Sequence, residues 1–81
     1  MNEIQVYERM VPIFQDVFDD DTLLVQAATT AADVDGWDSL AHIRLIVELE
    51  QAFNVRFSAG EASSFQQVAD VVASIIAKGG K

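Results

Sequence analysis

Apolar residues recur at helical intervals along most of the chain, and few stretches alternate between apolar and polar residues as strands do. The first helical pattern runs from about Asn2 to Phe18. Asn2 can cap it, and Gln5 completes the spacing of a capping box. Pro12 removes one backbone donor and favours a kink or a boundary, but we expect a single helix. Its predicted core-facing stripe is Ile4, Tyr7, Val11, Phe14 and Phe18.

A second helix is predicted from Asp38 or Ser39 to Phe53, after a long acidic loop. Asn54 suits its end, because asparagine tolerates the left-handed backbone found there. A loop of this length is unusual in a compact domain and is often functional. We expect its apolar residues 23–25 to anchor it to the core. The predicted buried stripe of the second helix is His42, Leu45, Ile46, Leu49 and Phe53.

Two further helices are predicted in the last third of the chain. Residues 55–57 should cross the core, and the capping-box spacing of Ser58 and Glu61 predicts a short helix around Glu61 to Ser63. Ser64 and Gln67 repeat that spacing before a last helix. The predicted core residues of this last helix are Val68, Val71, Val72, Ile75 and Ile76.

The predicted fold is all-α, a small four-helix bundle in a single domain covering residues 1–81. It has three main helices, a short third helix and a long loop between helices one and two. Gly79 should end the last helix, and we expect residues 78–81 to form a frayed tail.

Composition narrows the classes of function. The net charge of −8 argues against binding of nucleic acid and favours protein partners with positive surfaces. A hydrophobic content of 51% is too high for a disordered acidic tail. The chain has no cysteine, no signal-peptide pattern and no run approaching about 18 apolar residues. We therefore expect a soluble, monomeric protein of the cytoplasm with no membrane insertion and no metal site.

The second helix carries another apolar line beside its core stripe. Leu40, Ile43 and Val47 form this line, and Arg44 and Glu48 flank it. A helix of a small bundle needs only one buried stripe, so the second line suggests a surface for docking partners. The long loop packing over it is the alternative. We favour docking for Leu40 and Val47, while both interpretations stand for Ile43.

The segment Asp38-Ser39-Leu40, at the start of an amphipathic helix that ends in "LEQAFNVRF", resembles an acyl carrier protein. The resemblance covers nearly the whole chain, from the opening helix to the closing "FQQVADVVASI". It implies that Ser39 receives 4′-phosphopantetheine from coenzyme A, through a phosphodiester made by a phosphopantetheinyl transferase. The protein would then carry acyl or aminoacyl groups as thioesters, without catalysing a reaction itself. Its partners would be a loading ligase or transferase and the synthase or other acyl-transfer enzymes that act next.

The residues around Ser39 fit such a role. A helix N-terminus offers free N–H groups and the positive end of the dipole to a charged phosphodiester. Asp38 can cap the helix and can also help the transferase position the serine. Leu40 is expected to pin the turn so that the hydroxyl points outward. Trp37 is expected to anchor the loop on the bundle, and Gly36 to supply the backbone freedom of the turn.

Three other functions compete with this interpretation. A serine hydrolase needs a base near Ser39, but we expect His42 to be a semi-buried packing residue that can bond to the loop. The segment "GWDSL" also lacks the spacing of a G-x-S-x-G elbow. An EF-hand centred on Gly36 would place Ala31 and His42 where carboxylates belong. An unmodified helical module that binds a partner protein remains the serious alternative.

The sequence departs from the fatty-acid-synthesis carriers that it resembles. Those carriers present a second helix rich in Glu and Asp to basic partners, whereas Arg44 occupies an exposed position here. Such a change acts mainly on association rate and on partner choice. We therefore expect a free-standing, specialised carrier of a fatty-acid, polyketide or nonribosomal-peptide type of pathway.

Overall fold

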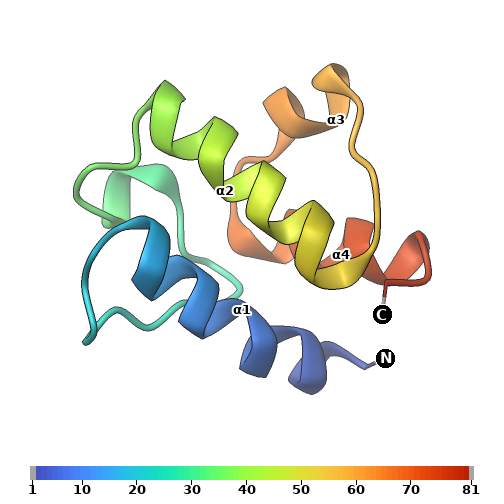
Figure 1. Ribbon diagram of the computed structural model, residues 1–81, viewed down its shortest axis with the longest axis horizontal. Helices are drawn as coiled ribbons and strands as arrows, with labels where there is room; N and C mark the ends of the chain where they lie inside the picture. Colours follow the sequence, from blue (N-terminus) through green and yellow to red (C-terminus); the bar gives the residue numbers. More distant parts are fainter. Residues whose placement is uncertain (1, 81) are drawn as a thin grey trace.

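Within residues 2–80, which the computed structural model describes, the chain forms four α-helices and one short 3₁₀ helix, without a strand (Figure 1). In chain order they are α1 (Glu3–Val17), the 3₁₀ helix η1 (Ala31–Asp33), α2 (Ser39–Phe53), α3 (Ala59–Ser64) and α4 (Val68–Ala77). α1 packs against both α2 and α4, and the short α3 lies on the opposite side of the bundle from α1. The predicted all-α bundle, with its short third helix and its long first loop, is confirmed.

The capping box of α1 is formed as predicted. The Asn2 carboxamide oxygen accepts the Gln5 N–H at 2.9 Å, and the Gln5 side chain accepts the Asn2 N–H at 3.0 Å. Pro12 lies inside one continuous helix. The predicted core stripe was wrong for Ile4, which is 69% exposed. Phe14 is fully buried, and the other predicted residues are partly buried against the core: Tyr7, Val11 and Phe18. The buried residues of α1 are Val6, Met10, Phe14 and Val17.

The core lies between α1, α2 and α4. Most of the predicted α2 stripe is buried, and Asn54 ends this helix with the expected left-handed backbone, at φ 55°. Of residues 23–25, Leu23 and Val25 pack against the core, whereas Leu24 is 72% exposed. The prediction that all of residues 23–25 anchor the loop was therefore wrong for Leu24. Side chains from α2, α4 and the connections complete the core: Leu45, Leu49, Phe53, Val55, Val68, Val71, Val72 and Ile75.

The long loop between α1 and α2 is tied directly to the start of α4. The carbonyl of Thr29 accepts the N–H of Val68 at 2.9 Å, and the carbonyl of Ala27 accepts the N–H of Ala69 at 2.9 Å. The first N–H groups of any α-helix lack acceptors inside the helix. The loop therefore supplies acceptors for the first N–H groups of α4, and these two hydrogen bonds hold the loop in place. They fix the path of the chain toward α2.

The short helix α3 has the predicted capping box of Ser58 and Glu61, with N–H to oxygen distances of 2.9 and 3.1 Å. The second predicted box, between Ser64 and Gln67, was wrong. Ser64 instead donates its hydroxyl to the Glu61 carbonyl at 2.8 Å. The carboxylate of Asp70 takes the Gln67 N–H, because Gln67 is itself the N-cap of α4.

The last residues of the chain are held more closely than the sequence suggested. Gly79 ends α4 with φ +71°, as expected. Gly80 is buried, and its N–H donates to the Ile75 carbonyl at 2.9 Å. Lys78 forms an ion pair with Glu61 at 2.9 Å. The predicted frayed tail was therefore wrong for residues 78–80, and Lys81 lies outside the described residues.

Candidate functional site

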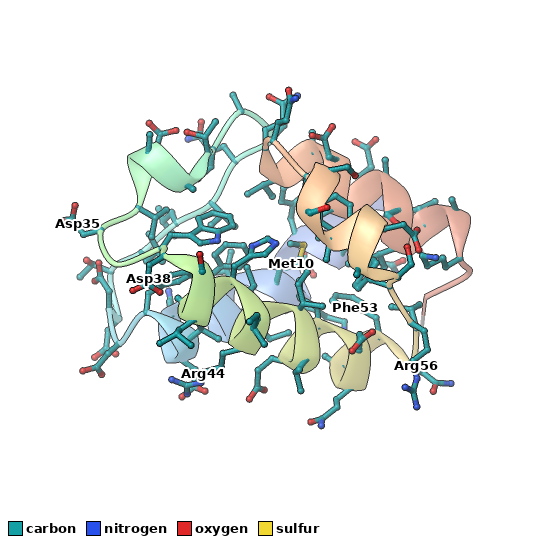
Figure 2. The ribbon with its side chains drawn as sticks, turned by 90° about the horizontal axis from the view of Figure 1, so that it is seen from above. Met10, Asp35, Asp38, Arg44, Phe53 and Arg56 are labelled. Atoms are coloured by element: carbon teal, nitrogen blue, oxygen red, sulfur yellow. The ribbon has the colours of Figure 1, made fainter. Side chains whose placement is uncertain are left out.

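Ser39 is the first residue of α2, and it is exposed to solvent. Asp38 precedes it as the N-cap, with an extended backbone at φ −99° and ψ −172°. The Asp38 carboxylate accepts the Ala41 N–H at 2.9 Å, and its carbonyl accepts the His42 N–H at 2.9 Å. Asp38 lies at the solvent-exposed start of α2 (Figure 2). The predicted cap and the predicted exposure of Ser39 are both present in the structure.

The segment before Ser39 is anchored by Trp37. Its ring contacts Phe14 edge-on at 5.5 Å and Phe18 at 5.6 Å between ring centroids. Gly36 has φ +85°, a left-handed value that favours glycine over residues with a side chain. Both expectations for this turn are confirmed. Leu40 does not pin the turn, because it is 79% exposed, so the cap and the tryptophan hold it instead.

His42 lies on the first turn of α2 and is partly buried, as predicted. Its Nδ1 accepts the Trp37 Nε1–H at 3.1 Å, which is the expected bond to the loop. Its Nε2 lies 2.8 Å from the Ala62 carbonyl oxygen of α3. The ring also stacks on Trp37, with an angle of 23° between the planes. Both ring nitrogens are engaged, so the imidazole has no free nitrogen to serve as a base for Ser39.

An open groove of about 490 Å³ runs beside Ser39, between the start of α2 and α3. Its polar end is formed by Asp38 and Ser39, and Trp37 and Phe65 add aromatic surface. The sequence did not reveal the contribution of α3, because only the fold brings that helix next to Ser39. The remaining lining residues are Ala31, His42, Ile43, Ala62 and Ser63.

The second apolar line of α2 faces solvent, so the long loop does not cover it. Leu40, Ile43 and Val47 are 79%, 62% and 44% exposed. Arg44 is exposed beside them and forms an ion pair with Asp16 at 3.6 Å, whereas Glu48 is only half-exposed. This surface starts one residue after Ser39 and follows the outer side of α2.

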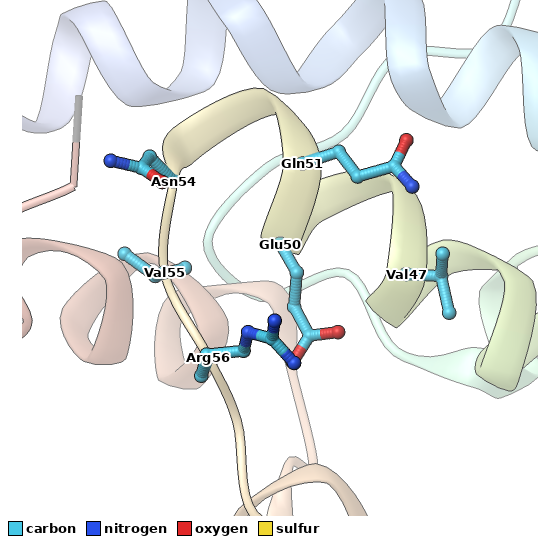
Figure 3. Close-up of a pocket in the computed structure, with 6 residues that line it drawn as sticks. All are labelled: Val47, Glu50, Gln51, Asn54, Val55 and Arg56. Carbon is cyan, nitrogen blue, oxygen red and sulfur yellow. The ribbon is translucent and has the colours of Figure 1, made fainter.

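A second hollow of about 390 Å³ lies at the other end of α2, away from Ser39 (Figure 3). Val47, Gln51 and Arg56 are among its lining residues. The carboxylate of Glu50, which also lines it, accepts the Phe57 N–H at 2.9 Å. Figure 2 shows that Arg44 and Arg56 both point away from the bundle. This hollow is open and polar; Val47 is the one residue of the predicted partner surface that lines it, and none of the predicted cofactor-binding residues does.

The acidic side chains of the first loop border a hollow of about 380 Å³ that includes Asp19, Asp20, Asp33 and Asp35. Hydrogen bonds from Thr22 lower the pKa of Asp20. Among residues 2–80, no group of three His, Cys, Asp or Glu side chains is arranged to hold a metal ion. None of the helices in this part of the chain is long and apolar enough to cross a membrane.

Comparisons with known proteins identify the family. Neither a scan against models of protein families nor a search of curated proteins finds a match. Among solved structures, the chain is similar to the solution NMR structure of a holo acyl carrier protein from Geobacter metallireducens. The two share 39% sequence identity over 89% of this chain and 83% of the other, with a TM-score of 0.82. The two proteins therefore share their sequence over most of both chains as well as their fold, and this chain belongs to the acyl carrier protein family.

Proposed function

We propose that Ser39 carries 4′-phosphopantetheine and that the protein presents acyl or aminoacyl groups, as thioesters on this arm, to partner enzymes. The observation that supports this best is the placement of Ser39, an exposed hydroxyl on the first residue of α2 beside an open groove. The holo form of the similar Geobacter metallireducens carrier is consistent with this assignment. The alternative, an unmodified interaction module, leaves the exposed serine without a role.

Attachment of the arm is a phosphoryl transfer in which Ser39 is the nucleophile. Its Oγ would form a bond to the pantetheine-linked phosphorus of coenzyme A, and the pyrophosphate P–O bond would break. Adenosine 3′,5′-bisphosphate leaves, and the serine proton passes to a base on the transferase. Because both nitrogens of His42 are already engaged, this chain offers no imidazole for that step. The catalytic groups would therefore belong to the transferase.

The start of α2 suits the phosphodiester that this transfer creates. The Ala41 N–H is taken by the Asp38 carboxylate. The N–H groups of Ser39 and Leu40 are first-turn donors, which have no acceptor within their own helix. Together with the positive end of the helix dipole, they favour a charged phosphate at this position. The same phosphate would experience repulsion from Asp38, which the exposure of both groups to water weakens.

The arm supplies the thiol that this sequence lacks, since the chain contains no cysteine. Acyl groups would ride on the arm as thioesters, and partner enzymes would carry out the chemistry. The groove between Ser39 and α3 gives the arm an apolar and aromatic surface to rest on between encounters. The protein would then act as a carrier that positions substrates, and not as an enzyme.

Partner enzymes would dock on the outer side of α2. Leu40, Ile43 and Val47 supply exposed apolar surface next to Ser39, and Arg44 and Glu48 border it. The transferase, a loading ligase or transferase, and the synthase or a later acyl-transfer enzyme would use this face in turn. Arg44 disfavours strongly basic partner surfaces, which supports a specialised pathway with fatty-acid, polyketide or peptide products.

The site assignment is tested by incubating the wild-type protein and Ser39→Ala with coenzyme A and a broad-specificity phosphopantetheinyl transferase. We expect the wild-type mass to rise by one phosphopantetheine and the variant to remain unmodified. Circular dichroism and urea unfolding should show that the variant keeps its fold, because an exposed hydroxyl contributes little to stability. Modification of the variant at Ser58 or Ser64 would move the site and overturn the assignment.

A further inference from the structure

The imidazole of His42 links two walls of the groove beside Ser39. We propose that His42 is a positioning residue: as a neutral ring with its proton on Nε2, it ties Trp37 to α3, and its protonation releases that tie. That the groove holds the phosphopantetheine arm rests on the proposed function, but the two hydrogen bonds of His42 do not depend on it. The chain has one histidine and one tryptophan, so both partners can be observed individually.

Only one protonation state of the ring satisfies both of its neighbours. The Trp37 indole nitrogen is a donor and never an acceptor, so the Nδ1 that it meets at 3.1 Å must be unprotonated. The Ala62 carbonyl is an acceptor, so the Nε2 that it meets at 2.8 Å must carry the hydrogen. A charged imidazole carries a hydrogen on both nitrogens. It would keep the bond to Ala62 and place two donors against each other at Trp37.

The tie joins segments that form the groove. Trp37 is fixed to α1 through its ring contacts with Phe14 and Phe18. Ala62 belongs to α3, a helix of six residues. The groove, and a small cleft of about 50 Å³ behind it, share Trp37 and His42 as lining residues. The position of α3 relative to Ser39 therefore depends on the imidazole between them.

α3 and the residue that follows it have other attachments to the rest of the chain. Lys78 of α4 pairs with Glu61 at 2.9 Å. Phe65, which follows α3, contacts Phe57 edge-on at 5.5 Å. A charged ring would keep the bond to Ala62 and lose the bond to Trp37. Protonation should therefore free the Trp37 indole while α3 stays bonded to His42, without unfolding the bundle.

The charged groups on the neighbouring elements have partners of their own. On α2, the Asp38 carboxylate accepts the Ala41 N–H, and it is the one carboxylate among the residues that line the groove. On α3, Glu61 is held by Lys78. At the start of α4, Asp70 accepts backbone N–H groups. On α1, Asp16 pairs with Arg44 across to α2.

The first test reads the protonation state directly in the unmodified protein. Nitrogen-15 NMR of the single imidazole at about pH 7.5, where an ordinary histidine is neutral, distinguishes protonated from unprotonated ring nitrogens. We expect Nδ1 to give the signal of an unprotonated nitrogen and Nε2 that of a protonated one. The opposite tautomer, or a charged ring at this pH, would overturn the proposal.

The second test follows Trp37 as the ring is protonated. Hydrogen exchange of the Trp37 indole N–H, corrected for the intrinsic effect of pH, is compared at about pH 7.5 and about pH 5. In the wild-type protein we expect this N–H to lose protection about fivefold at the lower pH, the factor that loss of one hydrogen bond gives. Emission from Trp37 should shift to longer wavelength over the same pH interval.

Two variants separate this role from simple packing. His42→Gln keeps one acceptor and one donor but does not titrate, so its indole exchange and its Trp37 emission should be independent of pH. His42→Phe fills the space without either bond, so its Trp37 indole N–H should exchange faster at both pH values. A wild-type profile that is flat, or that His42→Gln reproduces, would overturn the proposal. If His42→Gln does not fold, the pH profile and the imidazole nitrogen signals of the wild-type protein still test the proposal.

Both tests use the protein without its arm, so they stand apart from the proposed function. A confirmed tie with no labelling of Ser39 by coenzyme A would refute only the carrier assignment. Normal labelling of Ser39 with a pH-independent Trp37 would refute only the role of His42.

Discussion

Replacement of Asp38 separates the capping of α2 from the attachment of the arm. The Asp38 carboxylate accepts the Ala41 N–H at 2.9 Å from an N-cap backbone at φ −99° and ψ −172°. Asp38→Ala removes this acceptor and should lower the free energy of unfolding by about 1 kcal/mol. For a domain of this size, that loss corresponds to a decrease in Tm of about 4–8 °C.

Asp38→Asn is the matched control, because its carboxamide oxygen can accept the same N–H. It loses only the favourable charge at the helix N-terminus, which contributes about 0.3–1 kcal/mol at an exposed site. We therefore expect the stability order wild type, Asp38→Asn, Asp38→Ala in urea unfolding followed by helical circular dichroism. An Asp38→Ala variant as stable as the wild type would refute the assignment of Asp38 as the cap.

The rate of phosphopantetheine loading then shows whether Asp38 has a second role. If the transferase uses its charge to position Ser39, Asp38→Asn should load more slowly than the wild type under conditions where both are fully folded. If Asp38 is only a cap, the two proteins should load at equal rates. Initial rates from intact-protein mass spectrometry, at transferase-limiting concentrations, distinguish these results.

Three further predictions concern the C-terminus, acid stability and partner choice. Gly80→Ala places a Cβ 2.5 Å from Cγ2 of the buried Ile75, so the free energy of unfolding should fall by about 1–3 kcal/mol; unchanged urea unfolding would contradict the close contact. The hydrogen bond from Lys78 and the N–H of Ser58 hold the pKa of Glu61 at about 2, below its ordinary 4.5. The stability that these two hydrogen bonds give is fully present above pH 4.5 and is lost as the pH falls toward 2. Glu61→Gln should therefore lose less stability than the wild type over this pH range in acid unfolding, and added salt should reduce the difference. Arg44→Glu should raise kcat/KM several-fold with a fatty-acid-pathway malonyl transferase, mostly at low salt; an unchanged value would show that this charge does not select partners.

The sequence predicted an element best where its local pattern was compatible with only one structure. Asp38 and Asn54 marked the two ends of α2, and both take the expected cap conformations. In α1, two sets of apolar residues have helical spacing, and the sequence alone does not choose between them. Contacts with α2 and α4 bury Val6 and Met10 and leave Ile4 in solvent.

The parts that were missed depend on contacts between distant segments. The Ser64–Gln67 spacing fits a capping box, but the Asp70 carboxylate competes for the Gln67 N–H and takes it. The sequence suggested a frayed end at Gly80, because its burial depends on Ile75, five residues earlier, and on the distant side chain of Phe53. At the site, the sequence placed Ser39 and its cap but not the wall formed by α3, since no local pattern near residue 39 refers to that helix.

The most direct test of the carrier assignment is the intact mass of the wild-type protein expressed together with a phosphopantetheinyl transferase. The chain should gain the mass of a single phosphopantetheine, and fragmentation should place it on the peptide that contains Ser39. An unmodified mass, with a transferase that labels another acyl carrier protein in the same cells, would contradict the assignment.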